Sequence, residues 1–184
     1  MSVNDPLPWI AEECALIREA AEKNIPVIGH CLGGQLMSKA LGGEITKNPV
    51  KEIGWGGARP EANDVARRWF GELTDEATVF QWHGETFSLP PGATRILGNG
   101  YCTNQMFALG PHLGMQCHVE MTPEMIARWC QDWEKEVAEV AGLATLPPPV
   151  QTPRQMQAET PARLPAMRRL ADRLYSVWLA GLKR

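Results

Sequence analysis

The 184-residue sequence has little excess charge and lacks long apolar runs. Its 18 basic and 21 acidic residues give a formal net charge of −3, so the basic surface typical of nucleic-acid-binding proteins is missing. No apolar stretch approaches the roughly 18 residues that a membrane-spanning helix needs. The first residues also lack the basic and apolar regions of a secretory signal. We therefore expect neither nucleic acid nor a membrane as a partner.

The sequence also lacks a cysteine pattern suited to disulfides or metal. Its five cysteines are odd in number and scattered: Cys14, Cys31, Cys102, Cys117 and Cys130. No two of them form a C-x-x-C pair, which argues against a zinc site built on thiolates. Scattered, unpaired cysteines are typical of reduced thiols, so we expect a cytoplasmic protein without a bound metal.

Helical and extended patterns alternate along the chain, which predicts an α/β sheet with helices on both faces. The 44% hydrophobic content suits one domain over residues 1–184. Helices are predicted at 9–23, 34–41 and 122–141. Short strands are predicted at 25–28, 44–45, 52–55, 78–82, 95–97, 106–109 and 114–118.

Proline content divides the C-terminal part of the chain. Residues 142–165 contain six prolines, which predicts an extended loop. Residues 166–182 follow as a helix whose apolar stripe includes Met167, Leu170 and Leu174. We expect this last helix to dock on the domain through that stripe.

The strongest chemical signal is Gly29-His30-Cys31-Leu32-Gly33, which places a thiol between glycines at a predicted strand-to-helix turn. This spacing is typical of a nucleophile elbow, in which small residues avoid collisions within the tight turn. The N–H groups and dipole of the following helix favour the thiolate of Cys31. The alternative is a buried structural cysteine between two turn glycines.

A thiol nucleophile needs a base, and the base needs a group that orients it. His118 and Glu120 are two residues apart on a segment predicted to be extended, so their side chains point to the same side. Glu120 can therefore hold one imidazole nitrogen while the other faces Cys31. The alternative is a pair of surface polar residues on a loop.

Five motifs together resemble the class I glutamine amidotransferase domain, closest to its stand-alone, GMP-synthase-like members. They are Gly29-His30-Cys31-Leu32-Gly33-Gly34-Gln35, Glu52-Ile53-Gly54-Trp55, Trp82-His83-Gly84-Glu85, Gln105-Met106-Phe107 and Gln116-Cys117-His118-Val119-Glu120. The resemblance covers residues 1–139 and implies a three-layer, flavodoxin-like α/β fold. It also implies a hydrolase that needs no cofactor.

The resemblance assigns a role to each motif. Members of the family hydrolyse the side-chain amide of glutamine through a thioester and release ammonia. By resemblance, Cys31, His118 and Glu120 form the catalytic triad, and the Leu32 N–H is one oxyanion-hole donor. The substrate-binding residues implied are Gln35, His83, Gly84 and Glu85. Two alternatives stay open, since Gln35 could cap local backbone and His83 could be a structural histidine.

The partners and the competing functions follow from what surrounds this triad. A phosphate-binding loop of the form G-x-x-x-x-G-K-[ST] is missing, so this chain cannot itself adenylate an acceptor. Ammonia would pass to a separate synthase partner or be released. A γ-glutamyl hydrolase or peptidase would use the same triad on larger γ-glutamyl compounds. A catalytically compromised regulatory or binding subunit is the third reading.

Three features depart from the family pattern. Val119 stands where the family usually has proline, so the orientation of Glu120 is expected to be less restricted. His30 should point away from Cys31 on an extended chain and is not assigned as the base. Residues 1–5 resemble an internal segment that normally follows a Gly-Gly-Pro turn, so we expect an N-terminally incomplete sheet. Losing that turn's oxyanion donor would lower the rate by about 10²–10³.

Overall fold

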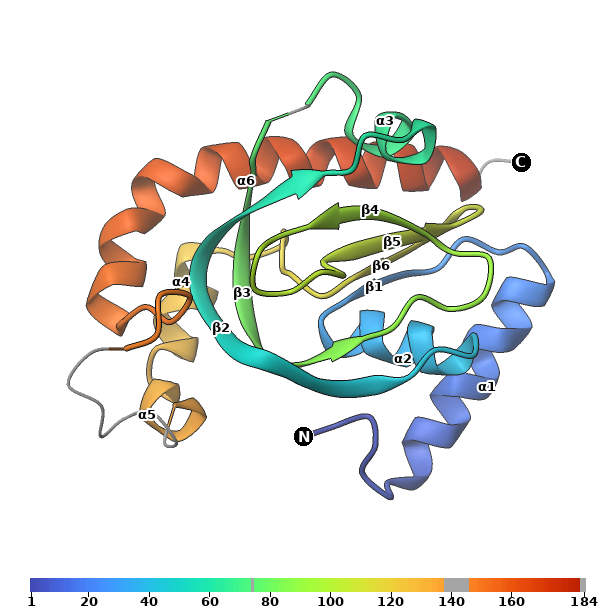
Figure 1. Cartoon of the computed structure of the whole chain (residues 1–184), viewed down its shortest axis with the longest axis horizontal. Coiled ribbons are helices and arrows are strands. Elements are labelled where there is room, and N and C mark those ends of the chain that lie inside the picture. Colours follow the sequence, from blue (N-terminus) through green and yellow to red (C-terminus); the bar gives the residue numbers. More distant parts are fainter. Residues whose placement is uncertain (74, 138–145, 183–184) are drawn as a thin grey trace.

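The computed structural model describes residues 1–73, 75–137 and 146–182, which build six strands and six helices (Figure 1). The strands are β1 (Ile28–His30), β2 (Ile45–Pro60), β3 (Ala77–Phe87), β4 (Thr94–Gly98), β5 (Met106–Leu109) and β6 (His112–Met115). The helices are α1 (Pro8–Glu22), α2 (Leu32–Ala40), α3 (Asp64–Phe70), α4 (Pro123–Trp129), α5 (Trp133–Glu136) and α6 (Pro153–Leu182). The sheet order is β1-β6-β5-β4-β2-β3, with β1 parallel to β6 and the other pairs antiparallel.

Strand β5 shows how the two faces of the sheet are filled. Met106 and Ala108 belong to a core that includes residues of α3, α4 and α6, whereas Phe107 belongs to a second core with residues of α1 and α2. Since successive strand residues point to opposite faces, helices cover both sides of the sheet. The predicted three-layer, flavodoxin-like α/β architecture is confirmed.

Most strand predictions are confirmed in position but not always in length, whereas those at 25–28 and 114–118 overlap β1 and β6 only in part. The predicted strand at 106–109 coincides with β5, whereas Ile45 of the strand predicted at 44–45 and all of the one predicted at 52–55 belong to the single long strand β2. An irregularity in β2 between Lys47 and Glu52 separates the two predicted pieces. The first strand begins at Ile28 rather than Ile25, since Pro26 has no N–H to pair.

The helix predicted from Thr122 to Ala141 is wrong in its length. Its start is confirmed, because the Thr122 hydroxyl accepts a hydrogen bond from the Met125 N–H at 3.2 Å. The chain leaves α4 after Trp129 in tighter turns, with the Asp132 N–H bonded to the Trp129 carbonyl at 3.0 Å. The short α5 begins at Trp133, and residues 138–141 of the prediction lie outside the described residues.

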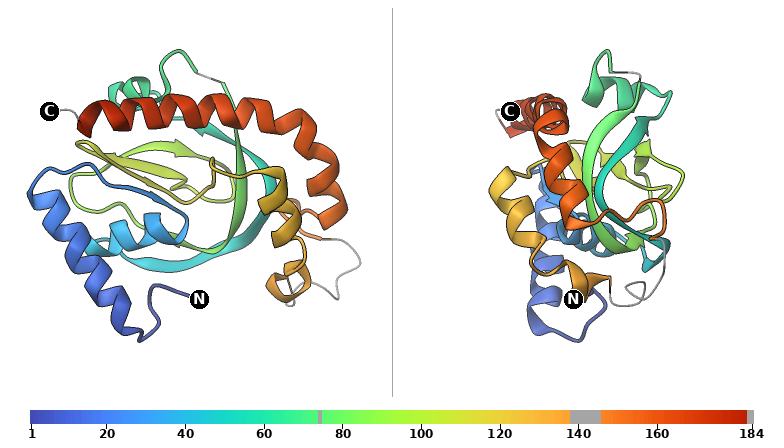
Figure 2. Two further views of the ribbon diagram at one scale, coloured as in Figure 1. Left: turned by 180° about the vertical axis from the view of Figure 1, so that it is seen from behind. Right: turned by 90° about the vertical axis from the view of Figure 1, so that its left-hand side faces the viewer.

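Helix α6 begins at Pro153, so the predicted loop over 142–165 is wrong beyond Thr152. Thr152 and Gln155 cap the helix reciprocally: the Gln155 N–H donates to the Thr152 hydroxyl at 3.3 Å, and the Thr152 N–H donates to the Gln155 side chain at 2.8 Å. Pro161 and Pro165 lie within the helix, which bends along its length (Figure 2). Residues 142–145 lie outside the described residues.

The predicted docking of the last helix is confirmed, because Met167, Leu170 and Leu174 are buried in the core against the sheet. Neither α6 nor any other described helix has the apolar length needed to cross a membrane.

The first turn of α2 packs directly on β6. A Cβ added to Gly34 would lie 2.2 Å from the carbonyl oxygen of Met115, and one added to Gly29 would lie 2.5 Å from the Gly33 backbone. Around Gly33 itself no atom lies within 4 Å of an added Cβ. The collisions expected in this turn therefore concern Gly29 and Gly34, and the expectation is wrong for Gly33.

We therefore predict that Gly34→Ala destabilises the protein by about 3 kcal/mol or more, because a backbone atom cannot move aside as a side chain can. Gly33→Ala is the matched control, with the same change one residue away in open space. It should shift stability by no more than about 1 kcal/mol, in the stabilising direction expected for alanine in a helix. Urea unfolding of the two variants checks this, and equal losses would contradict the packing described.

Candidate active site

Cys31 lies between β1 and α2 in a strained backbone conformation. Its φ of 47° and ψ of −106° are sparsely populated for a residue with a Cβ. Such a strained strand-to-helix turn is typical of a nucleophile elbow, where it exposes the reactive atom at the top of a sheet. Leu32 follows as the first residue of α2, so its N–H has no carbonyl partner within the helix and remains available to an oxyanion.

His118 and Glu120 lie together on the segment that follows β6. The backbone of His118 is fixed by two hydrogen bonds to Phe80 of β3, at 2.8 and 3.0 Å. Its ring packs edge-on against Trp129, with ring centroids 5.0 Å apart. His118 Nδ1 lies 2.6 Å from Glu120 Oε1, so the carboxylate holds this nitrogen as a donor and leaves Nε2 for another group.

The charges of this pair depend on each other and on Cys31. Burial alone would lower the pKa of His118, but the Cys31 thiol and the Glu120 carboxylate raise it to about 9. Burial alone would raise the pKa of Glu120, but the histidines His118 and His30 hold it at about 2. His118 Nε2 is buried and makes no hydrogen bond to the described residues, although Cys31 is near enough to affect the ring. At neutral pH the site therefore holds an imidazolium between the Glu120 carboxylate and the sulfur of Cys31.

Two further groups act on the second oxygen of Glu120. The Val119 N–H donates to Glu120 Oε2 at 2.9 Å, a hydrogen bond that proline at this position could not make. The expectation that valine leaves Glu120 less restricted is therefore wrong. His30 Nε2 lies 3.7 Å from the same oxygen and 3.0 Å from the Tyr175 hydroxyl of α6, which also buttresses this side of the site.

A cavity of about 870 Å³ opens beside Cys31. The predicted substrate-binding residues all line it, together with Cys31 and Leu32: Gln35, His83, Gly84 and Glu85. Gln35 is 4% exposed, and its amide donates to the Glu85 carbonyl at 3.3 Å. His83 is 6% exposed and is held on both sides, with Nδ1 3.0 Å from the Glu85 carbonyl and Nε2 3.1 Å from Glu52. These contacts agree with the alternative that His83 is a structural histidine.

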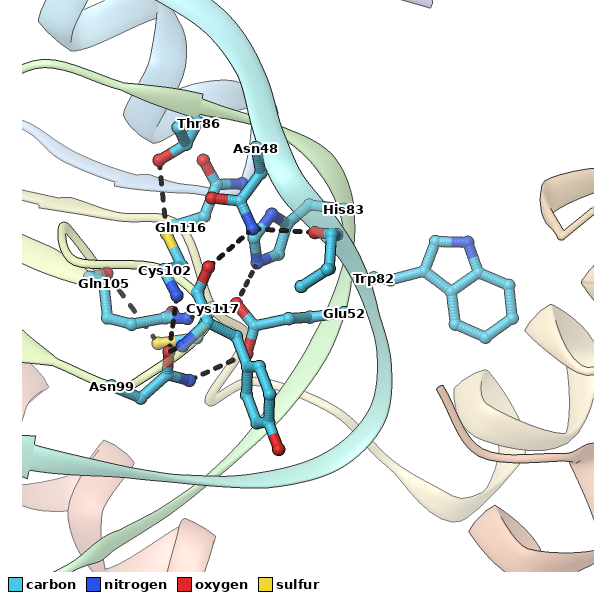
Figure 3. A network of polar contacts seen from close by, with 12 residues as sticks. Asn48, Glu52, Trp82, His83, Thr86, Asn99, Cys102, Gln105, Gln116 and Cys117 are labelled. Carbon is cyan, nitrogen blue, oxygen red and sulfur yellow. Dashed lines mark hydrogen bonds and ion pairs between the residues drawn. The ribbon is translucent and has the colours of Figure 1, made fainter. Parts of the chain in front are cut away.

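Glu52 is the centre of a buried polar network behind this cavity (Figure 3). Its carboxylate accepts hydrogen bonds from Asn99 at 2.7 Å and from Gln105 at 2.9 Å. Glu52, His83 and Cys102 each offer a possible metal ligand within 4.8 Å of the others. However, the carboxylate is already occupied by two amide donors, and burial raises the pKa of the Cys102 thiol to about 11. We interpret this group as a hydrogen-bonded network that stiffens β2 and β3.

Three residues near the site had no role assigned from the sequence. Glu52 and Gln116 occur in the quoted motifs, and their burial at 2% and 0% exposure marks them as internal polar groups. The burial of Glu52 and Gln116 follows from the register of the sheet, and the short motifs carry no information on that register. Tyr175 is 145 residues from His30 along the chain, and nothing local to either residue indicates their contact.

The comparisons agree with this geometry. The family described as glutamine amidotransferase class-I matches residues 2–129, and the chain belongs to that family. A crystal structure of a glutamine amidotransferase from Methylobacillus flagellatus is 43% identical, with a TM-score of 0.92 over 100% of this chain and 74% of that one. The crystal structure of a glutamine amidotransferase from Thermotoga maritima is 28% identical, with a TM-score of 0.82 over 100% of this chain and 75% of that one.

Curated relatives match a smaller part of the chain. The glutamine amidotransferase-like protein YfeJ of Salmonella typhimurium is 31% identical over 69% of this chain and 54% of its own length. Gamma-glutamyl peptidase 3 of Arabidopsis thaliana is 26% identical over 64% of this chain and 50% of its own length. The chain thus spans about half the length of these two relatives.

The coupled pKa values predict how Glu120→Gln changes stability with pH. The raised pKa of His118 stabilises the fold below its ordinary value of 6.5, and this stabilisation is lost as pH rises through about 9. The lowered pKa of Glu120 stabilises the fold above 4.5, and this is lost as pH falls through about 2. The stability difference between wild type and Glu120→Gln should therefore be largest between pH 4.5 and 6.5 and smaller above pH 9.

Urea unfolding at about pH 5.5 and about pH 9.5 measures that difference. Glu13→Gln, on the exposed side of α1, is the control and should show a small effect that is similar at both values. A wild-type advantage over Glu120→Gln that grows between the two pH values would contradict the ion pair.

Proposed function

We propose that this protein is a glutamine amidohydrolase of the amidotransferase type, with Cys31 as nucleophile, His118 as proton carrier and Glu120 as its orienting group. The observation that supports this most directly is the strained elbow at Cys31 beside the 2.6 Å contact between His118 and Glu120. Family membership supports the same chemistry. A nucleophile, a base and an acid that orients the base are the groups that this kind of covalent acyl transfer requires.

The reaction runs in two halves on these residues. The Cys31 thiolate attacks the side-chain amide carbon of glutamine, and the Leu32 N–H stabilises the oxyanion. Protonated His118 gives its proton to the departing nitrogen, so ammonia leaves and a glutamyl thioester remains on Cys31. Neutral His118 then takes a proton from water, whose oxygen attacks the thioester. Glutamate leaves, and the thiolate and the imidazolium are restored.

Substrate binding falls to the cavity beside Cys31. Gly84 and Glu85 are the lining residues we propose for the amino-acid end of glutamine, because the side chains of Gln35 and His83 are occupied by protein contacts. The Glu85 carboxylate accepts a hydrogen bond from the Ser2 hydroxyl at 3.0 Å and keeps further acceptor sites for a substrate. Several relatives are GMP synthases, including that of Neisseria meningitidis, in which the match spans 19% of the relative's length. A synthase partner that receives the ammonia is therefore part of the proposal. The cytoplasmic location stays a prediction.

A second candidate is hydrolysis of other γ-glutamyl compounds. The cavity of about 870 Å³ lies within the range of roughly 300–1,000 Å³ typical of sites for drug-sized ligands, which leaves room for a leaving group larger than ammonia. The similarity to gamma-glutamyl peptidase 3 supports this reading. Both candidates use the same thioester and differ in the amine that departs.

We predict that Cys31→Ala lowers glutaminase activity by at least about 10³-fold, because the covalent route is lost. Glu120→Gln should lower kcat by on the order of 10³-fold, because the imidazole loses its fixed orientation and charge partner. Cys130→Ser is the matched control, since this half-buried thiol contacts the Pro153 carbonyl and should leave the activity unchanged. Ammonia release with glutamine as substrate measures all three.

Activity that survives Cys31→Ala would contradict the assignment and favour the binding-subunit reading. Comparing kcat/KM for glutamine and for a γ-glutamyl dipeptide separates the two enzymes. A larger value for the dipeptide favours the γ-glutamyl hydrolase. A second oxyanion donor from a preceding glycine turn also stays a prediction, which a longer form of the chain tests by its rate.

A further inference from the structure

A row of buried amides connects the sulfur of Cys31 to a backbone carbonyl of β3. Gln116, which is fully buried, has its Nε2 3.7 Å from Cys31 Sγ and its Oε1 3.2 Å from Gln35 Nε2. The same Nε2 of Gln35 lies 3.3 Å from the carbonyl oxygen of Glu85. No part of the proposed reaction uses Gln116.

The carbonyl of Glu85 sets the direction of every hydrogen bond in this row. A peptide carbonyl can only accept, so Gln35 must present its NH₂ group to it. The second hydrogen of that NH₂ group then points to Gln116, which must present its oxygen. The two ends of one amide are opposite in character, so Gln116 presents its NH₂ group to Cys31. The sulfur therefore receives a donor.

The burial of both glutamine side chains preserves the direction of these hydrogen bonds. Gln116 and Gln35 are 0% and 4% exposed, so water competes little for their hydrogen bonds. Gln116 follows β6 directly, and the pairing of Met115 with His30 in the parallel register keeps it beside the residue that follows His30. The contact with Cys31 is thus fixed by the sheet as well as by side-chain hydrogen bonds.

We propose that Gln116 is a further catalytic residue: its amide N–H donates to Cys31 Sγ and favours the thiolate over the thiol, and Gln35 is the positioning residue that orients it. A donor stabilises an anionic acceptor more than the neutral form of the same group. The effect adds to that of the His118 imidazolium on the same sulfur. This inference rests on the proposed function only in taking Cys31 as the nucleophile.

Two variants of similar shape test the donor. Gln116→Glu can still accept from Gln35 but offers no donor to the sulfur in its ionised form, and Gln116→Met offers neither contact. The measurement is the rate at which iodoacetamide alkylates Cys31 across a range of pH, followed on the Cys31 peptide by mass spectrometry. We expect alkylation at neutral pH to slow by about 3–10-fold in both variants, with the pH profile moved to higher pH.

Gln35→Met should shift the profile in the same direction by a smaller amount, because Gln116 then keeps its donor but loses its fixed orientation. Gln35→Met also replaces the Gln116 variants as the test if these do not fold. Gln81→Met is the matched control: Gln81 is a buried glutamine of β3 whose amide makes no hydrogen bond to the described residues. In this variant iodoacetamide should alkylate Cys31 with the same pH profile as in the wild type.

A wild-type profile in Gln116→Met, or in Gln35→Met where the first variant does not fold, would overturn the proposal. So would an equal shift in Gln81→Met, which would indicate a general effect of disturbing the core. Alkylation requires no glutamine, so this result is separate from the proposed function. A Gln116-dependent profile in a protein without glutaminase activity would contradict only the proposed function.

Discussion

The parallel pairing of β1 with β6 is the constraint on which the site depends. Its register sets His30 opposite Met115, so the residues that follow the two strands emerge side by side. One strand leads into Cys31 and α2, and the other leads into the segment that carries Gln116, His118 and Glu120. The contact of Gly34 with the Met115 carbonyl holds α2 close enough for these groups to meet. A bulkier residue at position 34 would push α2, and with it Cys31, away from His118.

In the proposed mechanism, the groups that surround Cys31 favour negative charge on its sulfur or on the oxyanion formed during the reaction. Cys31 and the Glu120 carboxylate together raise the pKa of His118 to about 9. The carboxylate is itself held by the Val119 N–H and by His30, with Tyr175 behind it. Helix α2 adds the N–H groups of its first turn, beginning with Leu32, which have no carbonyl partner within the helix. The protein thus builds one electrostatic environment from three separate parts of the chain, including a helix that lies beyond the family match.

The features that the sequence predicts correctly are those that depend on residues close together in the chain. The elbow at Cys31 and the alternation of His118 with Glu120 are short patterns with a direct geometric meaning, and β5 was found from its apolar run. The proline content of residues 142–165 predicts a loop and hides the start of α6. The capping pair of Thr152 and Gln155 tolerates Pro153 at the first helical position, so the helix begins there. The contact between Tyr175 and His30 depends on how α6 packs, so only tertiary structure reveals it.

The most direct test of Cys31 as the nucleophile is to trap the acyl-enzyme. The protein is incubated with glutamine, quenched in acid within one turnover, digested and examined by mass spectrometry. The proposed mechanism predicts a glutamyl adduct on the Cys31 peptide. The amount of this adduct should rise in Glu120→Gln if the substitution slows hydrolysis of the thioester more than its formation. Hydrolysis of glutamine with no adduct on Cys31, or with an adduct on another residue, would contradict it.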